Sequence, residues 1–134
     1  MVEYFGEAIE KKQAMDFNPL VLAFVGDSVQ MLYIKTKLAL SHDCKSGKLH
    51  TLAKESVNAT AQAQTYEDIK DILTEEEMQV YKRARNSKTS SSAKNAKITD
   101  YRKATGFEAV IGYLYLTGQS GRLITLLDAS CRSI

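Results

Sequence analysis

Residues 18–34, with the sequence NPLVLAFVGDSVQMLYI, carry the strongest helix signal in the chain and limit how everything else can be arranged. Asn18 is suited to cap the free backbone N–H groups, and Pro19 at the first helical position loses no needed donor. An apolar face follows at helical spacing, formed by Leu20, Phe24, Met31 and Ile34. The pattern predicts a long helix over residues 20–40.

Asp27 falls on that same face, three residues after Phe24 and four before Met31. A carboxylate buried there without a partner would cost several kcal/mol, so we expect a partner, a metal ion or an opening to solvent. The plain alternative is a buried aspartate that a nearby arginine, lysine or backbone group satisfies. Gly26 costs about 1 kcal/mol relative to alanine inside a helix, which indicates close packing against another backbone.

Length and composition describe an ordinary globular chain. The 134 residues predict one domain, and the 44% hydrophobic and 25% charged residues are typical of such domains. We find no apolar run long enough to span a membrane, and the acidic N-terminus does not resemble a signal peptide. Cys44 and Cys131 fit no metal or redox motif, so we expect free thiols in a reducing cytoplasm.

The remaining pattern predicts helices and no strands. Residues 48–73 are helical but weaken in the middle, so two helices with a bend are expected there. Residues 58–64 alternate small and amide side chains, which could contact a nucleic-acid backbone but are better explained by close helix packing. Further helices are predicted over residues 74–85, from a capping box at its start, over 99–116 and over 122–131. The predicted fold class is all-α, with residues 1–17 as an N-terminal arm.

Positive charge is concentrated in one segment. Residues 82–103 contain eight basic side chains and one acid, whereas the whole chain has a net charge of +2. Such a local excess favours a polyanionic partner, although a solvated loop with acidic neighbours would give the same pattern. Residues 86–98 form a polar, low-complexity loop within this segment. The candidate phosphate-binding residues are Lys82, Arg83, Arg85, Asn86, Lys88, Lys94 and Lys97.

A second acid, Glu108, lies on an apolar stripe of a predicted helix, next to a second helix glycine, Gly112. If Glu108 met Asp27, the two carboxylates would repel unless a cation lay between them or one remained protonated. Oxygen ligands suit Mg²⁺ or Mn²⁺, and His42 and His50 do not have metal-ligand spacing. A carboxylate-bound Mg²⁺ close to a basic loop is typical of phosphodiester hydrolysis.

Two motifs now support a resemblance. FVGDSV at residues 24–29 and FEAVIGYLYL at residues 107–116 resemble the two acidic motifs of the ribonuclease III family, in the same order. YKRARNSK at residues 81–88, followed by Tyr101 and Arg102, resembles the Mini-III ribonuclease branch, a catalytic domain without a double-stranded-RNA-binding domain. The resemblance implies that residues 1–134 form a single ribonuclease III-like catalytic domain, folded as the endonuclease-domain helical bundle.

The resemblance also implies a function. It implies a homodimer with two active centres, hydrolysing double-stranded RNA with Mg²⁺, and it makes Asp27 and Glu108 both metal ligands and catalytic residues. The Mini-III branch implies maturation of the ends of large-subunit (23S) ribosomal RNA precursor, helped by a large-subunit ribosomal protein.

The sequence departs from the larger family members at two positions. They carry a further glutamate where this chain has Ala23, and an aspartate where it has Thr105. One well-held ion, with a second recruited by the RNA phosphate, is therefore expected. The same absences motivate an alternative, a non-catalytic RNA- or ribosome-binding protein on the same fold. A third alternative is a structural helical dimer whose basic loop binds no RNA.

Overall fold

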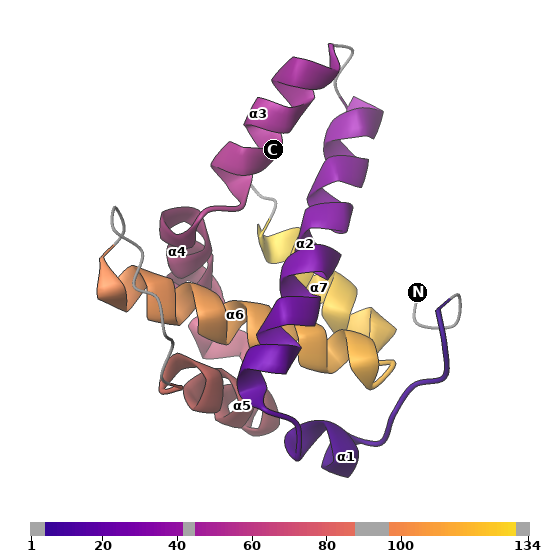
Figure 1. The fold of residues 1–134 in the computed structure, drawn as a ribbon, viewed down its shortest axis with the longest axis vertical. Coiled ribbons are helices and arrows are strands. Elements are labelled where there is room, and N and C mark those ends of the chain that lie inside the picture. Colours follow the sequence, from indigo (N-terminus) through magenta and orange to yellow (C-terminus); the bar gives the residue numbers. More distant parts are fainter. Residues whose placement is uncertain (1–4, 42–44, 88–96, 131–134) are drawn as a thin grey trace.

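The structure is a computed structural model that describes residues 5–41, 45–87 and 97–130. These residues form helices and connecting turns without any strand, which confirms the predicted all-α class (Figure 1). The elements are α1 (Lys11–Met15), α2 (Pro19–Ser41), α3 (Ser46–Ser56), α4 (Ala59–Ile69), the 3₁₀ turn η2 (Lys70–Ile72), α5 (Glu75–Arg85), α6 (Ile98–Leu116) and α7 (Ser120–Ser130). None of these helices is both long and apolar enough to cross a membrane.

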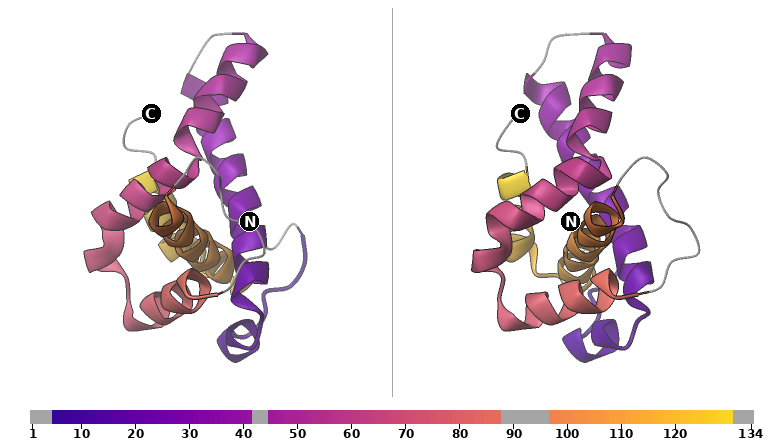
Figure 2. Two further views of the ribbon diagram at one scale, coloured as in Figure 1. Left: turned by 60° about the vertical axis from the view of Figure 1, so that its left-hand side comes forward. Right: turned by 90° about the vertical axis from the view of Figure 1, so that its left-hand side faces the viewer.

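Helix α6 lies at the centre of the bundle. It contacts α2, α4, α5 and α7, and the two views of Figure 2 show it running between them. A helix that is apolar on all sides belongs in the interior, and α6 has this character over its second half. Its buried positions are Ala104, Thr105, Gly106, Phe107, Ala109, Val110, Ile111, Gly112, Tyr113 and Leu114.

Two glycines bring α2 and α6 into backbone contact. A Cβ atom added at Gly26 would lie 1.7 Å from the carbonyl oxygen of Glu108, and one added at Gly112 would lie 1.9 Å from that of Leu22. Because real Cβ atoms never approach so closely, both positions require glycine. The close packing predicted for Gly26 is therefore confirmed, and it sets Asp27 directly beside α6.

The second half of α2 extends beyond α6, and α3 packs back along it (Figure 1). A small core of Ile34, Leu38 and Ala53 holds this pair together. The chain then bends at Asn58, whose side chain accepts a hydrogen bond from the Ala61 backbone N–H and so caps α4. The expected bend within residues 48–73 is confirmed.

The predicted capping box at the start of α5 is present, with Thr74 and Glu77 exchanging hydrogen bonds. Glu77 is only 3% exposed and also accepts from Arg122 of α7, with a distance of 2.8 Å between Nε and Oε2. Burial alone would raise the pKa of Glu77, but the bonds from Arg122 and Thr74 hold it below its ordinary value. This pair ties α5 to α7.

Some sequence predictions were wrong. Phe24, expected on the buried face of α2, is 76% exposed, because α6 crosses α2 on the side of Leu22 and Gly26 instead. Helix α6 begins at Ile98, one residue before the predicted start at residue 99, with Lys97 as its N-cap. Helices α3 and α7 begin at Ser46 and Ser120, two residues before the predicted starts at residues 48 and 122.

Candidate functional site

The structure brings the two predicted acids together. Asp27 projects from the middle of α2 and is exposed, while Glu108 projects from α6 and is half-buried. Burial, together with the adjacent Asp27 carboxylate, raises the pKa of Glu108 to about 9. The plain alternative of an aspartate buried with a basic partner is therefore wrong, because Asp27 opens to solvent beside another acid.

Two adjacent carboxylates cannot both be ionised at low cost in free energy unless a cation lies nearby. Without an ion, burial and the Asp27 carboxylate therefore favour the protonated form of Glu108. A divalent cation placed between the acids would replace that proton and allow both groups to carry charge. The electrostatics of Asp27 and Glu108 are thus those of an open cation site.

A third side chain, from α4, completes the surroundings of Glu108. The Gln62 amide lowers the pKa of Glu108 and partly opposes the effect of burial. The Gln62 Nε2 donates to Oε1 of Gln30 at 2.7 Å, and both amides are buried. Sequence reasoning missed this contact, because residues 58–64 were interpreted as packing; the three amides in this small-residue stretch were the available signal.

The positions of the additional family acids lie in the core. Ala23 is buried on α2, and Thr105 is buried on α6, where its Oγ1 donates to the Tyr101 carbonyl oxygen at 3.0 Å. Within the described ranges, no cluster of three or more His, Cys, Asp or Glu side chains could hold a metal. A pair of carboxylates still fits Mg²⁺, which commonly keeps several waters and is held by one or two carboxylates plus substrate phosphates.

The basic residues predicted to bind RNA have different surroundings. Lys82 and Asn86 are exposed near the end of α5, and Lys97 is exposed at the start of α6. The Arg85 guanidinium lies over the Tyr81 ring, 5.6 Å from its centroid, and its Nε donates to Asn86 Oδ1. Lys88 and Lys94 lie outside the described residues.

Arg83 is engaged within the fold. Its two terminal nitrogens donate to the carbonyl oxygens of Met15 and Phe17, at 2.6 and 3.3 Å. These bonds fasten α5 to the end of the N-terminal arm. The Arg83 guanidinium is therefore hydrogen-bonded within the fold, whereas the basic side chains of Lys82 and Lys97 face solvent.

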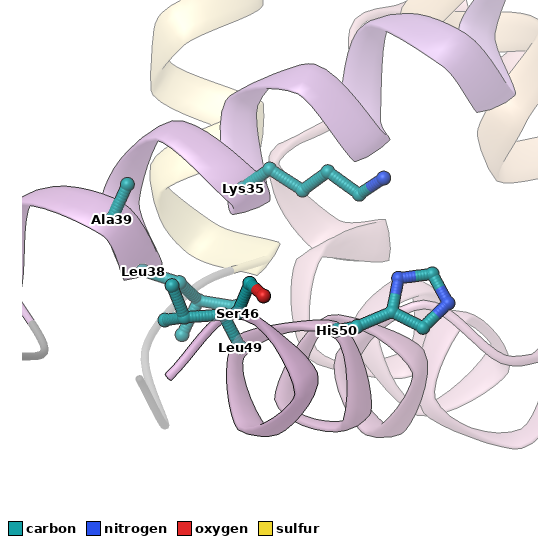
Figure 3. Close-up of a pocket in the computed structure, with 6 residues that line it drawn as sticks. All are labelled: Lys35, Leu38, Ala39, Ser46, Leu49 and His50. Atoms are coloured by element: carbon teal, nitrogen blue, oxygen red, sulfur yellow. The ribbon is translucent and has the colours of Figure 1, made fainter. Parts of the chain in front are cut away.

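A groove between α2 and α3 is separate from the acid pair. It measures about 280 Å³ and is lined by Lys35, Leu38, Ala39, Ser46, Leu49 and His50. Figure 3 shows Lys35 and His50 extending in the same direction from opposite sides of this groove. No carboxylate is among the described residues that line this groove. His50 is exposed.

An all-helical domain with two adjacent acids, one of them exposed, and a basic segment in its sequence fits a nuclease. The model of the Ribonuclease III domain matches residues 20–119, and the chain belongs to that family. It is accordingly an endoribonuclease involved in RNA processing. The family assignment therefore does not support the two alternatives, a non-catalytic RNA-binding protein and a purely structural dimer. Members of the family generally depend on divalent metal ions, act on double-stranded RNA and typically work as dimers.

Relatives place the chain in the Mini-ribonuclease 3 branch. It is 47% identical over 125 residues to Mini-ribonuclease 3 of Clostridium tetani, covering 92% of this chain and 83% of the relative. It is 41% identical over 128 residues to Mini-ribonuclease 3 of a Thermoanaerobacter species, covering 96% and 90%. An X-ray crystal structure of a Fusobacterium nucleatum protein superposes with a TM-score of 0.75 at 33% identity, covering 84% of this chain and 90% of that one. The expected endonuclease-domain bundle is thereby confirmed.

Proposed function

We propose that this endoribonuclease hydrolyses double-stranded RNA with Mg²⁺, or Mn²⁺ as a substitute, held by Asp27 and Glu108. We further propose that its substrate is large-subunit (23S) ribosomal RNA precursor in the cytoplasm, with a large-subunit ribosomal protein as helper. The observation that carries the catalytic part is the meeting of these two acids at the surface of the bundle. The names of the relatives and the basic segment support the choice of RNA.

Each acid has a distinct part in this proposal. The exposed Asp27 reaches the RNA side of the site, and the half-buried Glu108 is the fixed partner behind it. A bound divalent cation supplies activated water and neutralises charge on the phosphate in the transition state. Asp27 and Glu108 are the residues that would hold the ion, and Glu108 would be ionised in the ion-bound protein.

The basic segment gives a surface for the duplex. Lys82, Arg85, Asn86 and Lys97 flank the segment that also carries Lys88 and Lys94. A-form RNA presents phosphates and 2′-hydroxyls across a shallow minor groove, which cationic and amide side chains bind by shape. We assign Arg83 to the fold, because its guanidinium is bonded to the N-terminal arm. Binding should weaken steeply with salt, as phosphate contacts do.

A homodimer accounts for an exposed apolar face on α2. Phe24 is 76% and Leu32 51% exposed, and both line a groove of about 270 Å³ with Phe5, Val25 and Tyr115. Large contiguous apolar patches on a protein surface usually mark an interface. We propose that a second copy of the chain covers this face, which gives the dimer two centres, one for each RNA strand.

The test is cleavage of a defined RNA duplex by the purified protein with Mg²⁺, with and without a chelator. Cleavage should need both the divalent ion and the duplex, and a single strand of the same sequence is the matched control. Asp27→Asn should abolish cleavage while far-UV circular dichroism and duplex binding stay unchanged. Cleavage by Asp27→Asn at the wild-type rate would exclude Asp27 from the chemistry.

A further inference from the structure

An aromatic platform lies beneath one of the basic side chains at the end of α5. The rings of Tyr66, from α4, and Tyr81, from α5, are stacked with their centroids 3.8 Å apart and their planes at 6°. Tyr81 is only 1% exposed, and Gly106 of α6 leaves it room, because a Cβ at that glycine would lie 2.5 Å from the ring. Side chain and backbone from three helices therefore fix the plane of the Tyr81 ring.

The Arg85 guanidinium lies over this ring, from a position one helical turn further along α5. Its Cζ is 5.6 Å from the centroid of Tyr81, a distance at which the face of an aromatic ring attracts a cation. Its Nε donates to Oδ1 of Asn86 at 3.1 Å. The ring and the amide thus hold the planar guanidinium at two points.

The terminal nitrogens of Arg85 are left for a partner outside the fold. Among the residues that the structure describes, the side chain of Arg85 donates through Nε alone and forms no ion pair with a carboxylate. Arg83 gives the contrast, because its terminal nitrogens donate to the N-terminal arm. Two terminal nitrogens without acceptors present a planar fork that matches two oxygens of one phosphate.

We propose that Arg85 binds a backbone phosphate of the duplex through its two terminal nitrogens, and that Tyr81 and Asn86 are positioning residues that hold its guanidinium for this contact. The role rests on the proposed function, since it requires the protein to bind duplex RNA. It gives Asn86, expected to contact RNA, a part within the protein. A guanidinium that is held in place before binding loses less conformational entropy when the RNA arrives.

The decisive experiment is a double-mutant cycle between Arg85 and Asn86, measured as binding of a fluorescent RNA duplex in chelator. Arg85→Gln should weaken binding about tenfold and reduce the salt slope by about 1. Asn86→Ala should weaken binding about two- to fivefold in the unaltered protein and should have no effect beside Arg85→Gln. Gln79→Ala replaces an exposed amide earlier on α5 and is the matched control, which should show no such coupling.

Two further positions separate geometry from charge. Arg85→Lys keeps the charge and should keep the salt slope, but it should weaken binding about threefold or more, because an ammonium lacks the planar fork. Tyr81→Leu removes the ring and should weaken binding in the same way. Tyr81→Phe keeps the ring and should restore the affinity, since the hydroxyl that it removes has no hydrogen-bond partner among the described residues.

A spectroscopic readout tests the platform without RNA. In ¹H–¹⁵N spectra of the RNA-free protein, Asn86→Ala should move the Nε–H resonance of Arg85 and leave that of Arg102, an exposed arginine of α6, in place. Independent effects of Asn86→Ala and Arg85→Gln on binding, in a protein that binds and cleaves the duplex, would overturn the positioning role alone. If the unaltered protein does not bind the duplex, the proposed function fails and this role fails with it.

Discussion

At the scale of single residues, the site is a compromise between stability and chemistry. Glu108 is half-buried next to another acid, and burial with that neighbour raises its pKa to about 9. Two adjacent carboxylates repel each other, so this placement costs stability in the absence of a cation. The proposed divalent ion would remove that cost by binding the folded state.

This arrangement predicts that losing either acid stabilises the metal-free protein. Asp27→Asn and Glu108→Gln should each raise the melting temperature in chelator at pH 8. The corresponding gain in the free energy of unfolding should be about 0.5–2 kcal/mol. Mg²⁺ should raise the melting temperature of the unaltered protein, because the ion binds the folded state, and should have little effect on either variant. Glu55→Gln removes an exposed acid elsewhere and serves as the control. Melting at a lower temperature in both variants would mean that the pair is not under repulsion.

At the scale of elements, the position of the site depends on how α2 crosses α6. Gly26 immediately precedes Asp27, and the Cβ that any other residue would add lies 1.7 Å from the Glu108 carbonyl oxygen. The crossing can relax only by separating the helices, which would also separate the two acids. The backbone contact therefore determines the geometry of the carboxylates.

Gly26→Ala should consequently destabilise the protein severely despite the better helix propensity of alanine. We expect a loss of about 3 kcal/mol or more, at the upper end for overpacked sites, measured as the urea midpoint of unfolding. Gly47→Ala is the matched control, because nothing lies within 4 Å of a Cβ at that helical position. It should be neutral or stabilising by up to about 1 kcal/mol. Equal stability of the two variants would contradict the close crossing.

The link between α5 and α7 should make stability depend on acidic pH. Bonds from Arg122 and Thr74 hold the pKa of Glu77 below its ordinary value, so the folded state favours the ionised group. The stabilisation is present above the pKa of an unfolded glutamate, about 4.3, and is lost as pH falls through the lower folded value. Glu77→Gln should cost about 1–3 kcal/mol at pH 7 and progressively less below pH 4, measured by urea unfolding. Glu75→Gln, an exposed first-turn acid of α5, should show neither effect.

Elements and acids could be predicted from the sequence for different reasons. The helices have long apolar periodicity and clear caps, and Asp27 and Glu108 are conspicuous because acids rarely interrupt apolar stripes. The bond between Gln62 and Gln30 was not predictable, since the two residues are 32 positions apart and only the fold joins them. Phe24 was assigned to the core because an apolar residue that is exposed has the same local helical spacing as one that is buried.

At the scale of the whole molecule, the question is what covers the outer face of α2. The exposed side chains there follow α2, and the groove they line also includes Tyr115 of α6 and Ser28, the residue after Asp27. A second copy seated on this face would place the two acid pairs of a dimer near the shared surface. The oligomeric state and the function of the site are therefore linked.

Leu32→Glu should convert the protein to a monomer, because it places a charge in an apolar contact while changing no residue of the acid pair. Sedimentation velocity should give a dimer for the unaltered protein and a monomer for this variant, with the same far-UV circular dichroism. Leu40→Glu is the control, since Leu40 is 85% exposed near the far end of α2 and outside the groove. Cleavage of both strands of the duplex should decrease when the dimer is lost, because the single centre of a monomer reaches only one strand. A Leu32→Glu protein that remains dimeric would place the interface elsewhere on the molecule.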